Sequence, residues 1–304
     1  MKYYCVICGA LHRLRTAPVG SAVDKDFSFM QYTINVRGRL VDLSSPLVMG
    51  ILNATPDSFY AGSRKQTEAE IAARANEIIA QGGRIIDVGA FSTRPGAAEV
   101  SEEEETLRLR HALETVRREQ PDAIVSADTY RPDVARRCVE EFGADIINDV
   151  SEGGKTGICN TPLLHEDGDM FATVAQLGVP YILMSVQPTL TKMMQCFATE
   201  VQRLRDLGAK DILLDPGYGF GKTLEQNYEI MRHAERLLEL GLPILVGVSR
   251  KSMISRLLHC DAATALNGTT VLHTVSLMKG ASILRVHDVK EAVEAVRIVE
   301  QMQQ

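Results

Sequence analysis

The 304-residue sequence lacks a long hydrophobic run, an excess of basic residues and a regular set of cysteines. Its apolar stretches fall short of the roughly eighteen residues that a membrane span needs, which excludes a membrane-spanning protein. A net charge of −6 provides no basic field for nucleic acid, although it is compatible with a local anion site. The six scattered cysteines do not form a disulfide framework, so we expect a reducing, cytoplasmic compartment.

The first 29 residues carry no residue to which we assign a function. Cys5 and Cys8 form a CxxC pair, but no second pair or histidine cluster accompanies it to complete a zinc site. The apolar stretch 3–11 is interrupted by Gly9 and lacks the cleavage site of a signal peptide. Met30 could itself start translation. We therefore expect residues 1–29 to be a disordered or mis-annotated extension and residues 30–304 to form a single domain.

Apolar strands and amphipathic helices alternate along the rest of the sequence, after a β-hairpin expected at 32–36 and 39–42. Strands are expected at 47–52, 84–88, 124–127, 145–147, 181–184, 212–214, 244–247 and 283–286. Helices are expected at 67–81, 101–119, 132–142, 170–177, 193–207, 223–240, 252–279 and 289–302. Several of these helices end at a glycine, the usual C-terminal cap.

Eight strands, each followed by a helix, predict an α/β fold of the TIM (β/α)8 barrel type with an N-terminal β-hairpin. The apolar character of the strands agrees with this fold, because a parallel sheet covered by helices is buried on both faces. The connection 151–169 is long and polar, so we expect a mobile loop there. In such a barrel the active site lies at the carboxyl ends of the strands.

Polar residues follow all eight expected strands. Single examples have ordinary explanations, since Asp and Asn often cap a following helix and surface cations form weak pairs. Their recurrence at eight strand ends nevertheless favours one common site. Lys251, Arg285 and His287 follow the last two strands, where such barrels often bind phosphate, and Arg94 adds a cation from the second loop. The candidates for the other end of a phosphorylated ligand are Asp128, Asn148 and Asp215.

The stretch 212–222 carries the most informative pattern. Asp215 ends an apolar strand, Pro216 stops the strand ladder, and three glycines then allow the backbone to approach a ligand closely. A carboxylate at this place can accept two parallel hydrogen bonds from the edge of a planar aminopyrimidinone. Because no Ser–His–Asp order and no HExxH motif stand out, we expect catalysis by positioning and electrostatics.

Five segments resemble the bacterial dihydropteroate synthases, a family of pterin-binding TIM barrels. They are MGILNATPDSF (49–59), STRPGA (92–97), DPGYGFGK (215–222), SRKS (249–252) and RVHD (285–288). The resemblance runs from about residue 47 to 302. It implies a transferase of folate synthesis that condenses 6-hydroxymethyl-7,8-dihydropterin diphosphate with 4-aminobenzoate to 7,8-dihydropteroate and diphosphate. It also implies a homodimer and inhibition by sulfonamides.

The resemblance further implies a dissociative, SN1-like mechanism with Mg²⁺ bound near Asn53. The residues implied for the pterin are Asp128, Asn148, Met184, Asp215, Lys251 and Arg285. Those implied for the diphosphate are Asn53, Arg94, Arg285 and His287. Those implied for the aminobenzoate are Phe59, Thr93, Pro95, Ser249 and Lys251. The residues implied for catalysis are Asn53, Arg94, Lys251, Arg285 and His287.

The sequence departs from the family pattern at Ser185, where histidine is common, and in the unusual segments 186–188 and 60–63. These departures bear on loop closure and affinity. Two alternatives stay open: a pterin-binding methyltransferase that uses methyltetrahydrofolate and a corrinoid protein, and a pterin-binding scaffold without catalysis. Arg94 and the segment 249–251 argue against the methyltransferase. The residues that argue against the scaffold are the intact Asn53, Arg94, Lys251 and Arg285.

Overall fold

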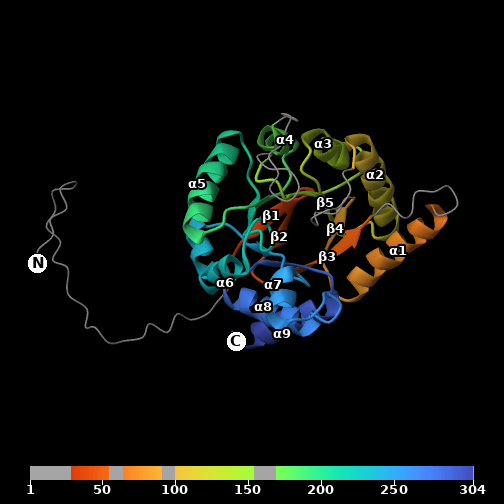
Figure 1. Cartoon of the computed structure of the whole chain (residues 1–304). Coiled ribbons are helices and arrows are strands. Elements are labelled where there is room, and N and C mark those ends of the chain that lie inside the picture. Colours follow the sequence, from red (N-terminus) through yellow and green to blue (C-terminus); the bar gives the residue numbers. More distant parts are fainter. Residues whose placement is uncertain (1–28, 55–63, 91–99, 154–168, 304) are drawn as a thin grey trace, which may run out of the picture.

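The computed structural model describes residues 29–54, 64–90, 100–153 and 169–303 (Figure 1). Residues 1–28 of the expected extension and most of the connection 151–169 lie outside these ranges. The helices form a ring around the strands, as the α/β barrel prediction requires (Figure 1). No helix in the described ranges has the length and apolar character that crossing a bilayer needs.

Eight parallel strands form the barrel wall, in the order β8-β7-β6-β5-β4-β3-β10-β9. They are β3 (Leu47–Asn53), β4 (Ile85–Gly89), β5 (Ile124–Asp128), β6 (Ile146–Asp149), β7 (Tyr181–Met184), β8 (Ile212–Asp215), β9 (Leu245–Val246) and β10 (Ile283–Val286). A parallel bridge between Leu214 and Ile244 joins the two outer strands of this order, and the Leu214 N–H donates to the Pro243 carbonyl over 2.9 Å. The prediction of a TIM barrel is therefore confirmed.

The outer layer consists of helices that alternate with the strands. They are α1 (Arg64–Ala80), α2 (Glu102–Glu119), α3 (Pro132–Glu140), α4 (Met170–Leu177), α5 (Leu190–Asp206), α6 (Leu224–Arg232), the 3-10 helix η3 (Ala234–Leu240), α7 (Ser252–Leu258), α8 (Leu266–Met278) and α9 (Val289–Gln301). Two expected long helices are broken. The helix expected at 223–240 becomes 3-10 after His233, and that expected at 252–279 stops at His259, whose backbone is left-handed with φ 52°.

A two-stranded hairpin, β1 (Thr33–Val36) and β2 (Arg39–Asp42), closes the amino end of the barrel. Arg37 and Gly38 have φ of 50° and 77°, as expected for the tight turn that matches the strand twist. Ile34, Val36 and Leu43 pack against the first inward-facing layer of the barrel. The buried members of that layer are Met49, Ile85, Ile146, Ile182, Leu213, Leu245 and Ile283.

The next inward-facing layer is polar. Side chains on one face of a strand recur every two residues, so the residues two positions after those of the first layer also face inward. Two of them are charged: Asp87, two residues after Ile85 in β4, and Arg285, two residues after Ile283 in β10. The strand register pairs Asp87 with Ser126, and Asp128 with Asn148. The carboxyl end of the barrel is therefore lined by hydrogen-bonding groups, above a closed apolar base.

Candidate active site

Arg285 lies between two carboxylates at the carboxyl end of the barrel. Its Nε donates to Asp87 Oδ2 over 2.6 Å, and its Nη2 donates to Asp128 Oδ2 over 2.7 Å. The Asn148 amide donates to the same Asp87 oxygen over 3.2 Å. Burial raises the pKa of Asp128 to about 7, against the attraction of Arg285 and with added repulsion from Asp87. This group therefore holds one arginine, two buried carboxyls and an amide in fixed relative positions.

Asp215 ends β8 inside the barrel mouth and is buried. Its Oδ1 accepts the Gly217 N–H over 2.7 Å, and burial raises its pKa, with Lys251 opposing the rise. The helix that follows has its own N-cap, since Thr223 forms a complete capping box with Gln226. Asp215 is thus not needed as the cap of α6, and its carboxylate faces the mouth beside buried Met184 of β7.

Lys251 lies against the loop 216–222 that follows β8. Its Nζ donates to the Tyr218 carbonyl over 2.5 Å and lies 4.7 Å from the centre of the Phe220 ring. Burial lowers the pKa of Lys251 to about 8, while Asp215 opposes that fall. Gly219 has φ +84°, and a Cβ there would lie 3.2 Å from Lys251 Cδ. The glycine-rich turn therefore leaves room for the lysine side chain to lie along the loop.

Ser249 and His287 connect the loops after β9 and β10. Ser249 Oγ accepts the His287 N–H over 3.2 Å. Burial, followed by the repulsion of Arg285, lowers the pKa of His287 to about 4, so the imidazole is neutral near pH 7. Arg250 pairs with both oxygens of Asp288 over 2.9 and 2.8 Å. These contacts join the loop that carries Lys251 to the loop that directly follows Arg285.

Asn53 is exposed at the end of β3, and β10 alone separates β3 from β9, the strand that precedes Lys251. A Cβ added to Gly89 would lie 3.8 Å from Asn53 Oδ1 and 3.6 Å from Asp128 Oδ2. Both oxygens therefore border the small space over Gly89. Four residues with expected roles, Phe59, Thr93, Arg94 and Pro95, lie outside the described residues.

Three further polar residues at the mouth received no role from the sequence: Asp87, Ser126 and Lys222. Asp87 Oδ1, Ser126 Oγ and Asp128 Oδ1 are buried and have no hydrogen-bond partner among the described residues. Because buried polar atoms are almost always paired, such a group indicates a place for a bound ligand or water. The alternation of inward residues after Ile85 is the signal that would have identified Asp87.

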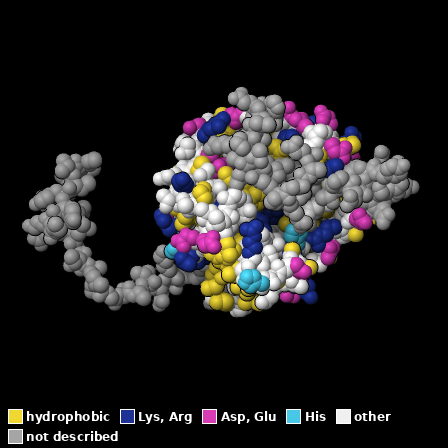
Figure 2. Space-filling view, in the orientation of Figure 1, with side chains coloured by type: hydrophobic (Ala, Val, Ile, Leu, Met, Phe, Trp, Pro, Cys, Tyr) yellow, Lys and Arg dark blue, Asp and Glu magenta, His cyan; other side chains and the backbone are white. Residues whose placement is uncertain are grey.

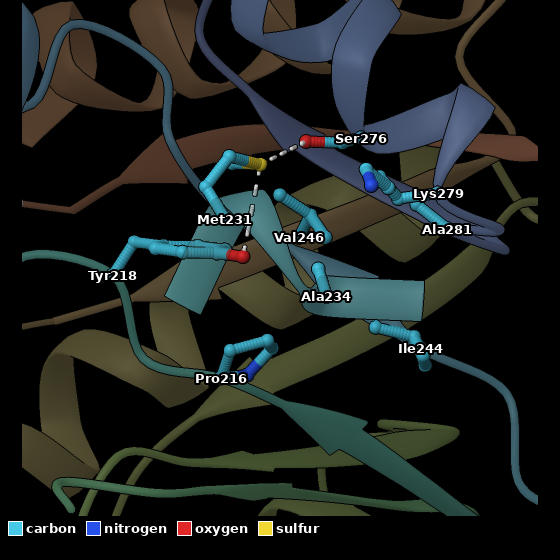
Figure 3. A pocket seen from close by; sticks show the side chains of 9 residues that line it. All are labelled: Pro216, Tyr218, Met231, Ala234, Ile244, Val246, Ser276, Lys279 and Ala281. Carbon is cyan, nitrogen blue, oxygen red and sulfur yellow. Dashed lines mark hydrogen bonds between the residues drawn. The ribbon is translucent and has the colours of Figure 1, made fainter. Parts of the chain in front are cut away.

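A separate small cavity lies behind the loop after β8, outside the barrel interior (Figure 3). Tyr218 points into it, and its hydroxyl donates to Met231 Sδ over 3.7 Å. The cavity volume is about 10 Å³, which is near the lower limit for one water molecule. This cavity is too small for a substrate, so the candidate site is the polar mouth of the barrel.

A model of the pterin binding enzyme family matches residues 49–287. Dihydropteroate synthase from Escherichia coli (strain K12) is 40% identical over 279 residues, covering 87% of this chain and 94% of the relative. The family match includes the carboxyl ends of all eight barrel strands.

Solved structures agree in fold and in sequence. Xanthomonas albilineans dihydropteroate synthase with 4-aminobenzoic acid is 31% identical at a TM-score of 0.79, covering 90% of this chain and 99% of that one. Yersinia pestis dihydropteroate synthase in complex with a sulfonamide drug is 36% identical at a TM-score of 0.78, with 90% and 99% covered.

Proposed function

This chain belongs to the pterin-binding enzyme family as a dihydropteroate synthase, a transferase of folate synthesis, and we propose its substrates and mechanism from the barrel mouth. The substrates proposed are 6-hydroxymethyl-7,8-dihydropterin diphosphate and 4-aminobenzoate. The observation that carries the proposal is a polar cluster of five residues, in which Lys251 and Arg285 are half-buried and the other three, Asp128, Asn148 and Asp215, are buried. Relatives bind pteroic acid, 4-aminobenzoate and a sulfonamide drug, which supports the same ligand classes here.

The pterin is proposed to lie over the apolar base of the barrel with its N–H edge toward the carboxyls. Asp215 accepts from the amino group and a ring N–H, and Asp128 with Asn148 binds the opposite part of the ring. The unpaired acceptor Asp128 Oδ1 supports this placement. Arg285 would stack on the ring, and Met184 would line the pocket beside Asp215.

Diphosphate is proposed to lie on the cation side of the mouth. Asn53, Arg285 and His287 would hold it, together with Arg94 from outside the described residues. Asn53 suits Mg²⁺ because it is an exposed residue with an amide oxygen, and Mg²⁺ commonly takes one or two protein oxygens beside substrate phosphates. When bound there, the ion would neutralise the charge of the departing diphosphate.

The proposed reaction is dissociative. The C–O bond to diphosphate breaks first and its electron pair leaves with the oxygen, so a cation delocalised over the pterin remains. The neutral arylamine nitrogen then forms the new C–N bond and releases a proton, without a general base of the protein. Ser249 and Lys251, with Phe59, Thr93 and Pro95, would frame the aminobenzoate. Sulfonamides would compete for the same place.

Product formation tests this proposal against its two alternatives. Purified protein with both substrates and Mg²⁺ should give 7,8-dihydropteroate and diphosphate in equal amounts, measured by chromatography. Methyl transfer from methyltetrahydrofolate to a corrinoid protein would support the methyltransferase instead. Pterin binding without any product would support the scaffold. Calorimetry should also show that aminobenzoate binds the free protein weakly and binds tightly once pterin and Mg-diphosphate are present.

A homodimer is also proposed. Figure 2 shows hydrophobic side chains gathered over the region of α8. The exposed hydrophobic residues of α7 and α8 include Leu257, Leu258, Val271 and Met278. A contiguous apolar surface of this kind favours association with another protein surface. Light scattering should give twice the mass of the 33.4 kDa chain, and the monomer mass would contradict the proposal.

A further inference from the structure

Lys222, at the end of the loop after β8, binds three backbone carbonyls at once. Its Nζ donates to the carbonyls of Ser185 and Gly217 over 2.9 Å each and to that of Phe220 over 3.1 Å. A protonated lysine has three N–H donors, so this set uses all of them. Two of the carbonyls belong to the loop after β8, and the third belongs to the loop after β7. The amine therefore joins two neighbouring loops at the barrel mouth.

The two loops touch backbone to backbone at this point. Gly217 has φ +63°, and a Cβ there would lie 2.2 Å from the Ser185 carbonyl oxygen and 3.0 Å from Met184 Cγ. Without a donor between them, the carbonyl oxygens would face one another in a buried place, which is costly. Burial lowers the pKa of Lys222 to about 7, against the attraction of Asp215. The three carbonyls favour the protonated amine, because a neutral amine has only two N–H donors.

Ser185 is held from its other side by a third loop, the one after β6. Its hydroxyl donates to Glu152 Oε1 over 2.9 Å, and Gln187 Nε2 donates to the two Glu152 oxygens over 3.2 and 3.0 Å. Glu152 is buried and has a left-handed backbone, with φ 56°. Ser185 and Gln187 are two of the residues at which the sequence departs from the family pattern. The departure thus builds a hydrogen-bonded network of its own.

We propose that Lys222 is a positioning residue, which sets the placement of Met184 and Asp215 by tying the loops after β7 and β8 through the Ser185 carbonyl. Glu152 fixes the same serine from the loop after β6. This inference rests on the proposed pterin site, because Met184 and Asp215 are its lining and its anchor. Lys222 itself faces backbone carbonyls and is not proposed to touch either substrate.

Lys222→Met tests the inference, because it keeps the length of the side chain and removes its donors. The Kd for 6-hydroxymethyl-7,8-dihydropterin, measured by calorimetry, should rise about ten- to a hundred-fold. The KM for aminobenzoate at saturating pterin diphosphate should change much less. Ser185→Ala and Glu152→Gln, which loosen only the outer link, should raise the same Kd by about three- to ten-fold.

Lys279→Met is the matched control. The Lys279 amine also donates to a backbone carbonyl, that of Arg232 over 2.9 Å, and to Glu235 over 2.7 Å, but on the outer helices. It should lower the melting temperature without changing pterin affinity. A Lys222→Met protein that behaves in the same way would overturn the inference.

If Lys222→Met does not fold, unchanged pterin affinity in both Ser185→Ala and Glu152→Gln would overturn the inference instead. A wild-type protein that binds no pterin would refute the proposed function itself, which is a separate result.

Discussion

The two ends of the barrel use the same strands for opposite purposes. Leu213 of β8 and Ile283 of β10 face inward at the amino end, in a closed apolar cluster with the hairpin. Two residues further on, Asp215 and Arg285 face inward at the carboxyl end, among buried polar groups. Two residues of a strand span about 6.6 Å. Within that distance the barrel changes from a stable base to a binding site.

The base and the mouth of the barrel also differ in whether their buried atoms have hydrogen-bond partners. The base contains apolar side chains that need no partner, and hydrophobic burial stabilises it. The mouth retains buried acceptors without partners among the described residues, namely Asp87 Oδ1, Ser126 Oγ and Asp128 Oδ1. Each such atom costs stability in the free protein and is available to a ligand. Changes at the base should therefore alter stability, and changes at the mouth should alter binding.

Leu213→Ala should have the largest effect and should act on stability alone. Removing a buried leucine leaves a cavity in the closed base, which should lower the free energy of unfolding by about 2–5 kcal/mol. The folded fraction should keep its KM for pterin diphosphate. Urea unfolding followed by circular dichroism, with steady-state kinetics below the transition, measures both. A raised KM at unchanged stability would contradict the expectation that changes at the base alter stability and changes at the mouth alter binding.

Asp215→Asn, two residues along the same strand, should have the opposite effect: it should weaken pterin binding and leave stability nearly unchanged. The amide replaces one acceptor by a donor, so a pterin N–H would face another N–H. Pterin affinity should fall by about 2–4 kcal/mol, or roughly 30- to 1000-fold. Stability should stay close to that of the wild type or rise, since burial of the Asp215 carboxylate raises its pKa and so disfavours its charged form.

Unchanged pterin affinity in Asp215→Asn would refute its role as the pterin anchor. Thr223→Ala is the appropriate control, because Thr223 is the residue that caps α6. It should lower stability by about 1 kcal/mol and leave pterin affinity intact.

The pH dependence of pterin binding should show a smaller effect at the mouth. Because burial raises the pKa of Asp128 to about 7, the folded protein holds a proton there between pH 3.8 and 7 that the unfolded chain releases. This contribution therefore favours the fold at low pH and is lost as pH rises through 7. Pterin N–H groups need the carboxylate, so the Kd should rise about ten-fold from pH 8 to pH 6. In Asp128→Asn the Kd, measured by calorimetry, should no longer rise toward pH 6, and a wild-type Kd that does not rise toward pH 6 would contradict the assignment.

Strand positions were predictable because their apolar runs are local. The strands expected at 181–184 and 283–286 coincide with β7 and β10. Others extend further by a polar residue, such as Asn53, Asp128 or Asp215, since ladder hydrogen bonding continues in register past the last apolar side chain. The break at His259 was missed because apolar periodicity continues across it, whereas the turn depends on Asp261 accepting the Thr264 N–H.

The candidate site was predictable as a set of residues but not as a set of contacts. Asp128, Asn148, Asp215, Lys251 and Arg285 do meet at one end of the barrel. Their pairing could not be read from local pattern. Arg285 and Asp87 are 198 residues apart in sequence, and the same arginine also reaches Asp128.

The contacts of Lys222 could not be predicted from the sequence either. Its partners are backbone carbonyls, which every residue carries and which no sequence motif marks.

Deleting residues 1–28 should have the smallest effect on stability and turnover. It tests whether the apolar base of the barrel includes residues before the hairpin. Phe29 packs against the core, so the deletion stops before it. The match to the Escherichia coli relative covers 94% of that protein but 87% of this chain, and the match to the Xanthomonas albilineans structure covers 99% of that protein but 90% of this chain. About a tenth of this chain therefore has no counterpart in either relative. Stability should change by less than about 0.5 kcal/mol, with turnover unchanged. Deleting residues 1–43 is the contrasting case, because it removes Ile34, Val36 and Leu43 from the apolar base and should abolish soluble, cooperative folding. A fall of several degrees in melting temperature after the shorter deletion would show that the base of the barrel extends beyond its hairpin.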